Sequence, residues 1–188
     1  MRSRAAYKLE EVQKSNKLLS KGQQVFDLGC WPGGWLEMAA GFVGPRGRVV
    51  GVDRAKVDPE IPLSQVTALV GDLEAADIVD RLRECLGSDR ADVVLSDAAP
   101  KLTGIRETDR ANEERLLEAI EALLPQLLGV GGSLLIKILE SPEAQLIDRR
   151  MRASFDRAKT LKLRSTRKGS SERYLIARGY SGVATSIR

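Results

Sequence analysis

Short apolar segments alternate with amphipathic segments along most of this sequence. The apolar segments have the length and composition of buried strands, and we predict strands over 24–28, 48–53, 66–70, 91–96, 133–139, 159–164 and 173–178. The intervening segments have helical spacing, which predicts helices over 3–20, 34–41, 75–87, 110–128 and 142–154. This alternation is typical of an α/β fold. We expect a mostly parallel, seven-stranded open sheet with helices on both faces.

Length and composition fit one globular domain. The chain has 188 residues, of which 43% are hydrophobic and 30% are charged. We predict one domain over 1–188, with a basic helix within 1–22 packed on or beside it. The longest apolar runs are shorter than the roughly 18 residues of a membrane span, and no signal-peptide pattern opens the sequence. Two cysteines, Cys30 and Cys85, indicate a reducing compartment. We therefore expect a cytoplasmic protein without a membrane partner.

The absence of histidine limits the kinds of catalytic and metal site that this protein can have. It excludes Ser-His-Asp triads, histidine metal clusters and histidine general bases. The two cysteines are too few for a zinc site, so we expect no metal. Any general base must be a carboxylate, a lysine, a tyrosine or a cysteine.

Charge is segregated along the chain. Residues 1–22 carry six basic and two acidic side chains, and residues 149–173 carry ten basic and two acidic ones. Residues 23–148 hold 12 basic and 22 acidic side chains. An acidic body with basic ends predicts a polyanionic partner bound by both ends. The alternative is that these cations only keep the surface solvated. The candidate contacts with such a polyanion are Arg2, Arg4, Arg164 and Arg167.

The segment 25–35 has the pattern of a buried strand, a glycine-rich turn and the start of a helix. Gly29, Gly33 and Gly34 permit backbone conformations and close approaches that a Cβ would block. The spacing differs from that of a dinucleotide-binding fingerprint, and no P-loop lysine follows. Asp53 ends the next strand, where an acid can bind a ribose hydroxyl pair. The alternative is a turn that only packs strand against helix.

Four acids lie at or just past the ends of successive predicted strands. They are Asp27, Asp53, Asp72 and Asp97. Because ligands of open α/β sheets bind at the carboxyl ends of the strands, these acids should share one site. Their charges would repel phosphates and suit a nucleoside that carries ribose hydroxyls and an amine.

Lys137 stands alone inside an apolar strand. Burial there favours the neutral amine, which makes Lys137 a candidate general base. Adjacent carboxylates such as Asp97 and Glu172 would favour the charged form, which orients a hydroxyl and stabilises developing negative charge. An exposed lysine at a strand end is the remaining alternative.

The motifs together resemble the FtsJ/RrmJ family of S-adenosylmethionine-dependent RNA ribose 2′-O-methyltransferases, with a Rossmann-like class I methyltransferase fold. The resemblance rests on five blocks: residues 3–9 (SRAAYKL), Asp27-Leu28-Gly29 with residues 32–35 (PGGW), residues 95–100 (LSDAAP), residues 135–137 (LIK) and residues 171–174 (SERY). It implies that the family's catalytic tetrad is Lys8, Asp97, Lys137 and Glu172. It also implies that Gly33, Trp35, Asp53, Asp72 and Asp97 bind the cofactor S-adenosyl-L-methionine.

The resemblance further implies the substrate. The nearest branch looks like the bacterial enzyme that methylates a uridine in the A loop of large-subunit ribosomal RNA, and we expect a monomer. A transfer RNA methyltransferase and a non-catalytic RNA-binding assembly factor of the same fold are the alternatives. Core packing remains an alternative for Trp35, and surface positions remain alternatives for Lys8 and Glu172. Cys30 and Trp31 replace the family's usual small residues, so either the glycine loop differs in shape or Trp31 faces outward.

Overall fold

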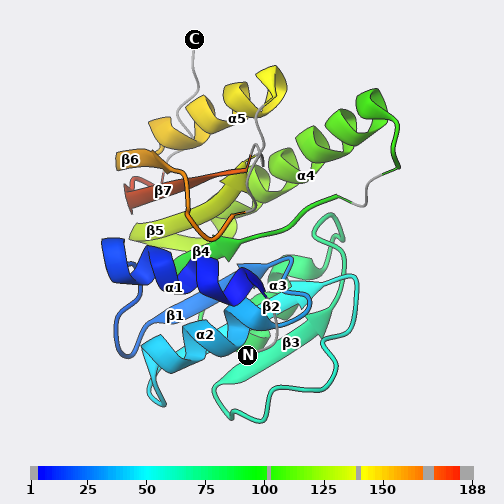
Figure 1. Ribbon diagram of the computed structural model, residues 1–188. Coiled ribbons are helices and arrows are strands. Elements are labelled where there is room, and N and C mark those ends of the chain that lie inside the picture. The colour runs from blue at the N-terminus through cyan, green and yellow to red at the C-terminus, as the bar shows by residue number, and fades with distance from the viewer. Residues whose placement is uncertain (1–3, 101–102, 139–140, 167–171, 183–188) are drawn as a thin grey trace.

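Seven strands form one sheet in the order β3-β2-β1-β4-β5-β7-β6 (Figure 1). The computed structural model describes residues 4–100, 103–138, 141–166 and 172–182. The strands are β1 (Gln24–Leu28), β2 (Arg48–Asp53), β3 (Val66–Val70), β4 (Ala91–Ser96), β5 (Leu128–Ile138), β6 (Phe155–Leu161) and β7 (Arg173–Tyr180). The helices are α1 (Arg4–Asn16), α2 (Gly34–Val43), α3 (Ile78–Leu86), α4 (Arg106–Leu127) and α5 (Pro142–Ala153). β1 to β5 pair in parallel, and β7 is antiparallel to both β5 and β6.

Two hydrophobic cores lie on opposite faces of the sheet. One is built from α3, α4 and α5 against the sheet, and the other from α1 and α2. The central strand β1 is buried on both faces, which explains its nearly continuous apolar sequence. Edge strand β3 alternates partly buried and exposed positions. The predicted α/β fold is therefore confirmed.

The register brings the ends of the first four strands to one edge of the sheet. Leu28 pairs with Val52 on β2, and Asp53 pairs with Val70 on β3. From β1 the chain adds β2 and β3 on one side and then β4 on the other, so the strand order switches between β1 and β4. Open α/β sheets bind their ligands at such a switch, outside the carboxyl ends of the strands.

Some element bounds differ from the predicted ones. α1 ends at Asn16 rather than at residue 20, because Lys17 adopts a left-handed conformation with φ of 48°. The Gln13 side chain also hydrogen-bonds both the N–H and the carbonyl of Leu19, at 2.8 Å each. These contacts turn the chain toward β1.

The largest of the other differences concern the second half of the chain. α4 begins at Arg106 rather than at residue 110, and β5 begins at Leu128 rather than at residue 133. β6 covers Phe155–Leu161 rather than 159–164, because it pairs with β7 along that whole length. Most of its side chains are exposed or half-buried, so the strand has no apolar alternation to recognise. Within the described ranges, no helix has the length and apolar character to cross a membrane.

Candidate active site

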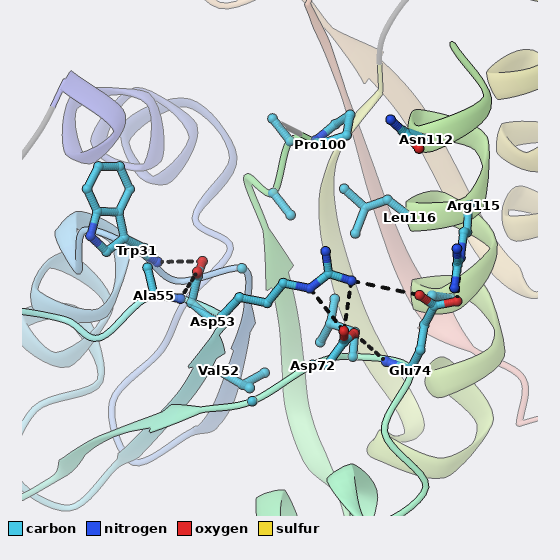
Figure 2. Close-up of a pocket in the computed structure, with 17 residues that line it drawn as sticks. Trp31, Val52, Asp53, Ala55, Asp72, Glu74, Pro100, Asn112, Arg115 and Leu116 are labelled. Atoms are coloured by element: carbon cyan, nitrogen blue, oxygen red, sulfur yellow. Dashed lines mark hydrogen bonds and ion pairs between the residues drawn. The ribbon is translucent and has the colours of Figure 1, made fainter. Parts of the chain in front are cut away.

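A cavity of about 790 Å³ lies at the carboxyl edge of β1 to β4 (Figure 2). Four strand-end loops form most of its lining, and α4 supplies one wall. The lining includes Gly29, Trp31, Asp53, Ala55, Asp72, Glu74, Ala98, Pro100, Asn112, Arg115 and Leu116. The volume is within the usual range for small-molecule sites, and the position is the one expected for an open α/β sheet.

The glycine loop approaches the loop after β4 so closely that Gly29 has no room for a side chain. Its φ is 82°, and a Cβ at this position would lie 2.4 Å from Cβ of Ala98. The Gly29 N–H donates to the carbonyl of Val52 at 2.8 Å, which fixes the loop to β2. Gly33 has φ of 99° immediately before α2. The predicted need for glycine at both positions therefore has a structural basis.

Asp53 organises the cavity wall at the end of β2. Its Oδ2 accepts a hydrogen bond from the main-chain N–H of Trp31 at 3.0 Å, and its Oδ1 accepts one from Ala55 at 2.9 Å. Figure 2 shows both bonds as dashed lines on the left of the cavity. Each carboxylate oxygen keeps a further lone pair that can accept a ligand hydroxyl. The Trp31 side chain is 58% exposed, so it faces outward at this edge.

Asp72 and Glu74 lie in an ion-pair network across the cavity. Arg54 contacts Asp72 Oδ2 through Nε at 3.0 Å and through its terminal nitrogen at 2.8 Å. Arg115 of α4 donates from Nε to Glu74 at 2.8 Å. The main-chain N–H of Glu74, followed by the Arg54 guanidinium, lowers the pKa of Asp72 despite the opposing effect of burial. The acidic edge predicted from the strand ends is thus partly neutralised by two arginines.

Asp27 lies behind the cavity rather than on it. Its side chain is fully buried, and neither carboxylate oxygen has a hydrogen-bond partner among the described residues. Burial, with the nearby charges of Asp97 and Asp53, raises the pKa of Asp27 well above its usual value. A protonated carboxyl is the form that such an apolar site favours.

The residues proposed as a catalytic tetrad come together beside the cavity. Lys137 Nζ donates to the main-chain carbonyl of Asp97 at 2.7 Å and lies 3.3 Å from its Oδ1. Lys8 Nζ lies 3.5 Å from the other oxygen of Asp97 and 3.0 Å from Glu172. α1, the loop after β4, β5 and the segment before β7 each supply one member, and Lys137 is only 8% exposed. Asp97 directly precedes Ala98 of the cavity lining, so the cluster adjoins the cavity.

Tyr174 completes this cluster, although sequence reasoning gave it no role beyond a place in a motif. Its hydroxyl donates to Asp97 Oδ1 at 2.6 Å, and its ring lies 5.5 Å from Lys8 Nζ. Burial first, and then the Asp97 carboxylate, raises the pKa of Tyr174. The phenol therefore remains a hydrogen-bond donor at neutral pH.

Trp35 connects α1 to this cluster from within the core. It is 2% exposed, and its Nε1–H donates to the carbonyl of Ala5 at 2.6 Å. Its ring centroid lies 6.2 Å from that of Tyr174. The described residues that line the cavity do not include Asp27, Gly33, Gly34 or Trp35.

The sequence model of the FtsJ-like methyltransferase family matches residues 1–180 of this chain. The chain belongs to that family. The resemblance inferred from the motifs is thereby confirmed.

Named family members support the same assignment over nearly the whole chain. Ribosomal RNA large subunit methyltransferase E from Methanothermobacter thermautotrophicus is 39% identical over 181 residues, which are 96% of this chain and 85% of that protein. The protein of the same name from Pseudomonas aeruginosa is 37% identical, with 96% and 86% covered.

Two solved structures share the fold. A protein from Plasmodium falciparum, solved as a candidate ribosomal RNA methyltransferase, has a TM-score of 0.83 at 26% identity and covers 97% of this chain and 100% of that one. Aeropyrum pernix fibrillarin, solved with natively bound S-adenosyl-L-methionine, has a TM-score of 0.65 at 17% identity, with 93% and 76% covered. The fibrillarin likeness shows the fold alone.

The proposed RNA-binding arginines are only partly described. Arg2 and Arg167 lie outside the described residues, and Arg4 begins α1 with a side chain that is not described. Arg164 is exposed, and its main-chain N–H donates to Glu11 of α1 at 2.8 Å. The RNA contacts of this family member therefore stay a prediction.

In the described parts of the chain, no three cysteine or acidic side chains are grouped as a metal site.

Sequence reasoning missed the basic part of the cavity as well as Tyr174. Arg54 follows a recognised strand-end acid, and Arg115 lies on a predicted helix, but nothing in their spacing links them to Asp72 or Glu74. The ion pairs arise only when the sheet brings β2, β3 and α4 together.

Proposed function

We propose that this family member methylates a ribose 2′-hydroxyl of large-subunit ribosomal RNA, at a uridine of the A loop, with S-adenosyl-L-methionine as the methyl donor. The observation that carries the proposal is the contact between the cavity and the cluster of Lys8, Asp97, Lys137 and Glu172. It offers a nucleoside-sized site next to groups that can act on a hydroxyl. Relatives at 37–39% identity are named as ribosomal RNA large subunit methyltransferases, which supports the substrate class.

The cavity residues fit the proposed cofactor. Asp53 presents carboxylate oxygens to a ribose hydroxyl pair, and Asp72 is placed to accept hydrogen bonds from an amine. Asp97, at the boundary with the catalytic cluster, would hold the cofactor's charged amino acid end. When bound, the cofactor supplies an electrophilic methyl group, and loss of this group converts the cofactor's sulfonium sulfur to a thioether.

The protein's part in the reaction is to position the ribose and manage the hydroxyl proton. Holding two reactants in line can supply about 7–11 kcal/mol of the barrier reduction. General base catalysis adds about 10²–10⁴-fold in rate. Lys137, the buried lysine of β5 beside the cavity, can approach the 2′-oxygen from the side of that strand.

Asp97 fixes the direction of Lys137 by accepting two contacts from its Nζ. In the ammonium form, a third N–H remains for the 2′-oxygen and stabilises its developing negative charge. In the amine form, a lone pair remains to accept the hydroxyl proton. A rate that rises with pH toward a plateau indicates the amine, and a flat profile indicates the ammonium.

Lys8 and Glu172 support this arrangement. Lys8 offsets the charge of Asp97 from the α1 side, and Glu172 offsets the charge of Lys8. Such mutual pairing keeps four ionisable groups close together at one site. A non-catalytic assembly factor has no need of this cluster, so the cluster argues against that alternative function.

We further propose that the protein acts as a monomer in the cytoplasm.

Mapping of 2′-O-methyl groups in RNA from cells with and without the gene tests the proposal. The expected result is the loss of one methylated uridine in the A loop, which a plasmid-borne copy restores and a Lys137→Met copy does not. Loss of a 2′-O-methyl group from transfer RNA alone would assign the alternative substrate. Unchanged ribose methylation in all RNA would contradict the proposal.

A further inference from the structure

A groove lies between the end of α1 and the β6–β7 pair, on the sheet face that α1 and α2 share. It encloses about 570 Å³ and is lined by Asn16 and Lys17 from the end of α1, Arg157 and Lys159 from β6, and Ile176 and Arg178 from β7. In Figure 1, the chain after β6 descends toward α1. Glu11 holds this segment by accepting hydrogen bonds from the main-chain N–H groups of Arg164 and Ser165, at 2.8 and 3.0 Å.

The groove is basic. Lys17, Arg157 and Lys159 are exposed, and within the described ranges none of them is in an ion pair. Arg54 and Arg115 are instead paired with carboxylates. Because side chains alternate along a strand, Arg157 and Lys159 project from the same face of β6. Ala158 between them packs toward the opposite core.

Lys17 is held in place at a conformational cost. Its φ of 48° is uncommon for a residue with a Cβ, and glycine or asparagine usually takes this position after a helix. Arg178 donates to the carbonyls of Asn16 and Lys17 at 2.6 and 3.1 Å, which satisfies main-chain acceptors at the end of α1. A lysine at this backbone position adds a cation to the groove where an asparagine would fit the backbone better.

The groove lies further along the β6–β7 pair from the catalytic cluster. On β6, Leu161 pairs with Tyr174, Lys159 pairs with Ile176 and Arg157 pairs with Arg178. At about 3.4 Å per residue, Lys159 lies about 7 Å and Arg157 about 14 Å along the strand from the level of Tyr174. The unpaired cations thus follow β6 away from the level of Tyr174, on the face that α1 covers.

We propose that this groove binds the phosphate backbone of the substrate RNA on one side of the methylated nucleotide, through Lys17, Arg157 and Lys159. The inference rests on the proposed function for the identity of the RNA. Exposed, unpaired cations beside a catalytic site complement a polyanion, and phosphate contacts position a nucleic acid without reading its sequence. The groove adds a third group of RNA contacts to the terminal arginines.

The test compares two charge-matched double variants. Arg157→Gln/Lys159→Gln removes two cations from the groove, and Arg46→Gln/Arg90→Gln removes two exposed cations of the acidic body, outside both basic ends. Binding to an A-loop RNA is measured from 50 to 200 mM salt. Losing two phosphate contacts lowers the log–log salt slope by about 1.4 to 1.8, which makes the loss of affinity over that range about 7- to 12-fold smaller. The control double variant should retain the parental slope.

Lys17→Asn provides a variant that the backbone favours. We expect it to unfold at the same temperature as the parent or a higher one, while its salt slope falls by about 0.7 to 0.9. A photo-crosslinking side chain at position 159 should attach to RNA near the methylated nucleotide, whereas one at position 46 should not.

Failure of this inference is distinguishable from failure of the proposed function. If the parent transfers methyl groups to the ribose and the groove variants bind RNA like the control at every salt concentration, the groove inference is wrong. Equal binding to naked RNA with weaker binding to the assembled subunit would assign the groove to a ribosomal protein and also overturn it. If the parent transfers no methyl group to ribose, the proposed function fails whatever the groove binds.

Discussion

The Tyr174 hydroxyl donates a 2.6 Å hydrogen bond to Oδ1 of Asp97, the same oxygen that lies 3.3 Å from Lys137 Nζ. This shared acceptor connects the antiparallel strand β7 with the end of β4. It makes Tyr174 a positioning residue, because the phenol fixes the carboxylate that in turn directs Lys137.

Tyr174→Phe should slow methyl transfer. Hydrogen bonds to charged groups contribute about 1.5–3 kcal/mol, so a loss of about 10- to 100-fold in kcat is expected if Asp97 loses its orientation. The Phe side chain retains the packing against Trp35, and cofactor affinity measured by calorimetry should stay near the parental value. Parental kcat in this variant would show that the hydrogen bond has no positioning role.

Trp35→Phe separates the structural and the cofactor-binding interpretations of Trp35. The variant loses the hydrogen bond to the Ala5 carbonyl, which should lower the free energy of unfolding by about 0.5–1.5 kcal/mol. Because α1 carries Lys8, kcat should also fall, with cofactor affinity nearly unchanged. A large drop in cofactor affinity at parental stability would instead place Trp35 in the cofactor site.

Asp53→Ala should reduce S-adenosylmethionine affinity by at least about tenfold. It removes carboxylate acceptors from the cavity and releases the N–H groups of Trp31 and Ala55, and hydrogen bonds to a charged group are each typically worth about 1.5–3 kcal/mol. Asp58→Ala, an exposed acid in the following loop, is the matched control. Equal cofactor affinity in the two variants, measured by calorimetry, would remove Asp53 from the site.

Asp27 should make stability depend on pH. Its folded-state pKa is raised by burial and by the charges of Asp97 and Asp53, so its contribution is fully present below the unfolded pKa and is lost as pH rises through the folded pKa. Asp27→Asn mimics the protonated form. As the pH rises from the unfolded-state pKa to the folded-state pKa, this variant should gain stability relative to the parent by up to about 1.4 kcal/mol per pH unit. Chemical unfolding of both proteins from pH 4 to pH 8 checks this. A constant difference across the range would show that Asp27 does not titrate abnormally.

The sequence was informative where local pattern decides the structure. The predicted bounds of β1, β2, β3 and β4 agree with the observed ones, because these strands are largely apolar runs that stop at a polar residue or just before a glycine. Their ends also placed Asp53 and Asp72 correctly at one sheet edge. Edge strand β6 was misplaced, because its largely exposed sequence has no buried face to mark it.

Other features depend on tertiary contacts that spacing does not encode. Trp35 follows the glycine loop in sequence, yet α1 covers it and makes it part of the core. Arg54 neutralises Asp72 only because β2 and β3 end side by side. The hydrogen bond from Tyr174 to Asp97 joins residues 77 positions apart.

The most direct test of the account is the transfer of labelled methyl groups from S-adenosylmethionine to large-subunit RNA, followed by nucleoside analysis. The comparison is between the parent, Lys137→Met and Lys14→Met, a change at an exposed lysine of α1. We predict labelled 2′-O-methyluridine with the parent and Lys14→Met. Lys137→Met should be at least about 100-fold slower at unchanged cofactor affinity. Label on a base rather than on ribose, or a Lys137→Met variant that retains most of its turnover, would contradict the account.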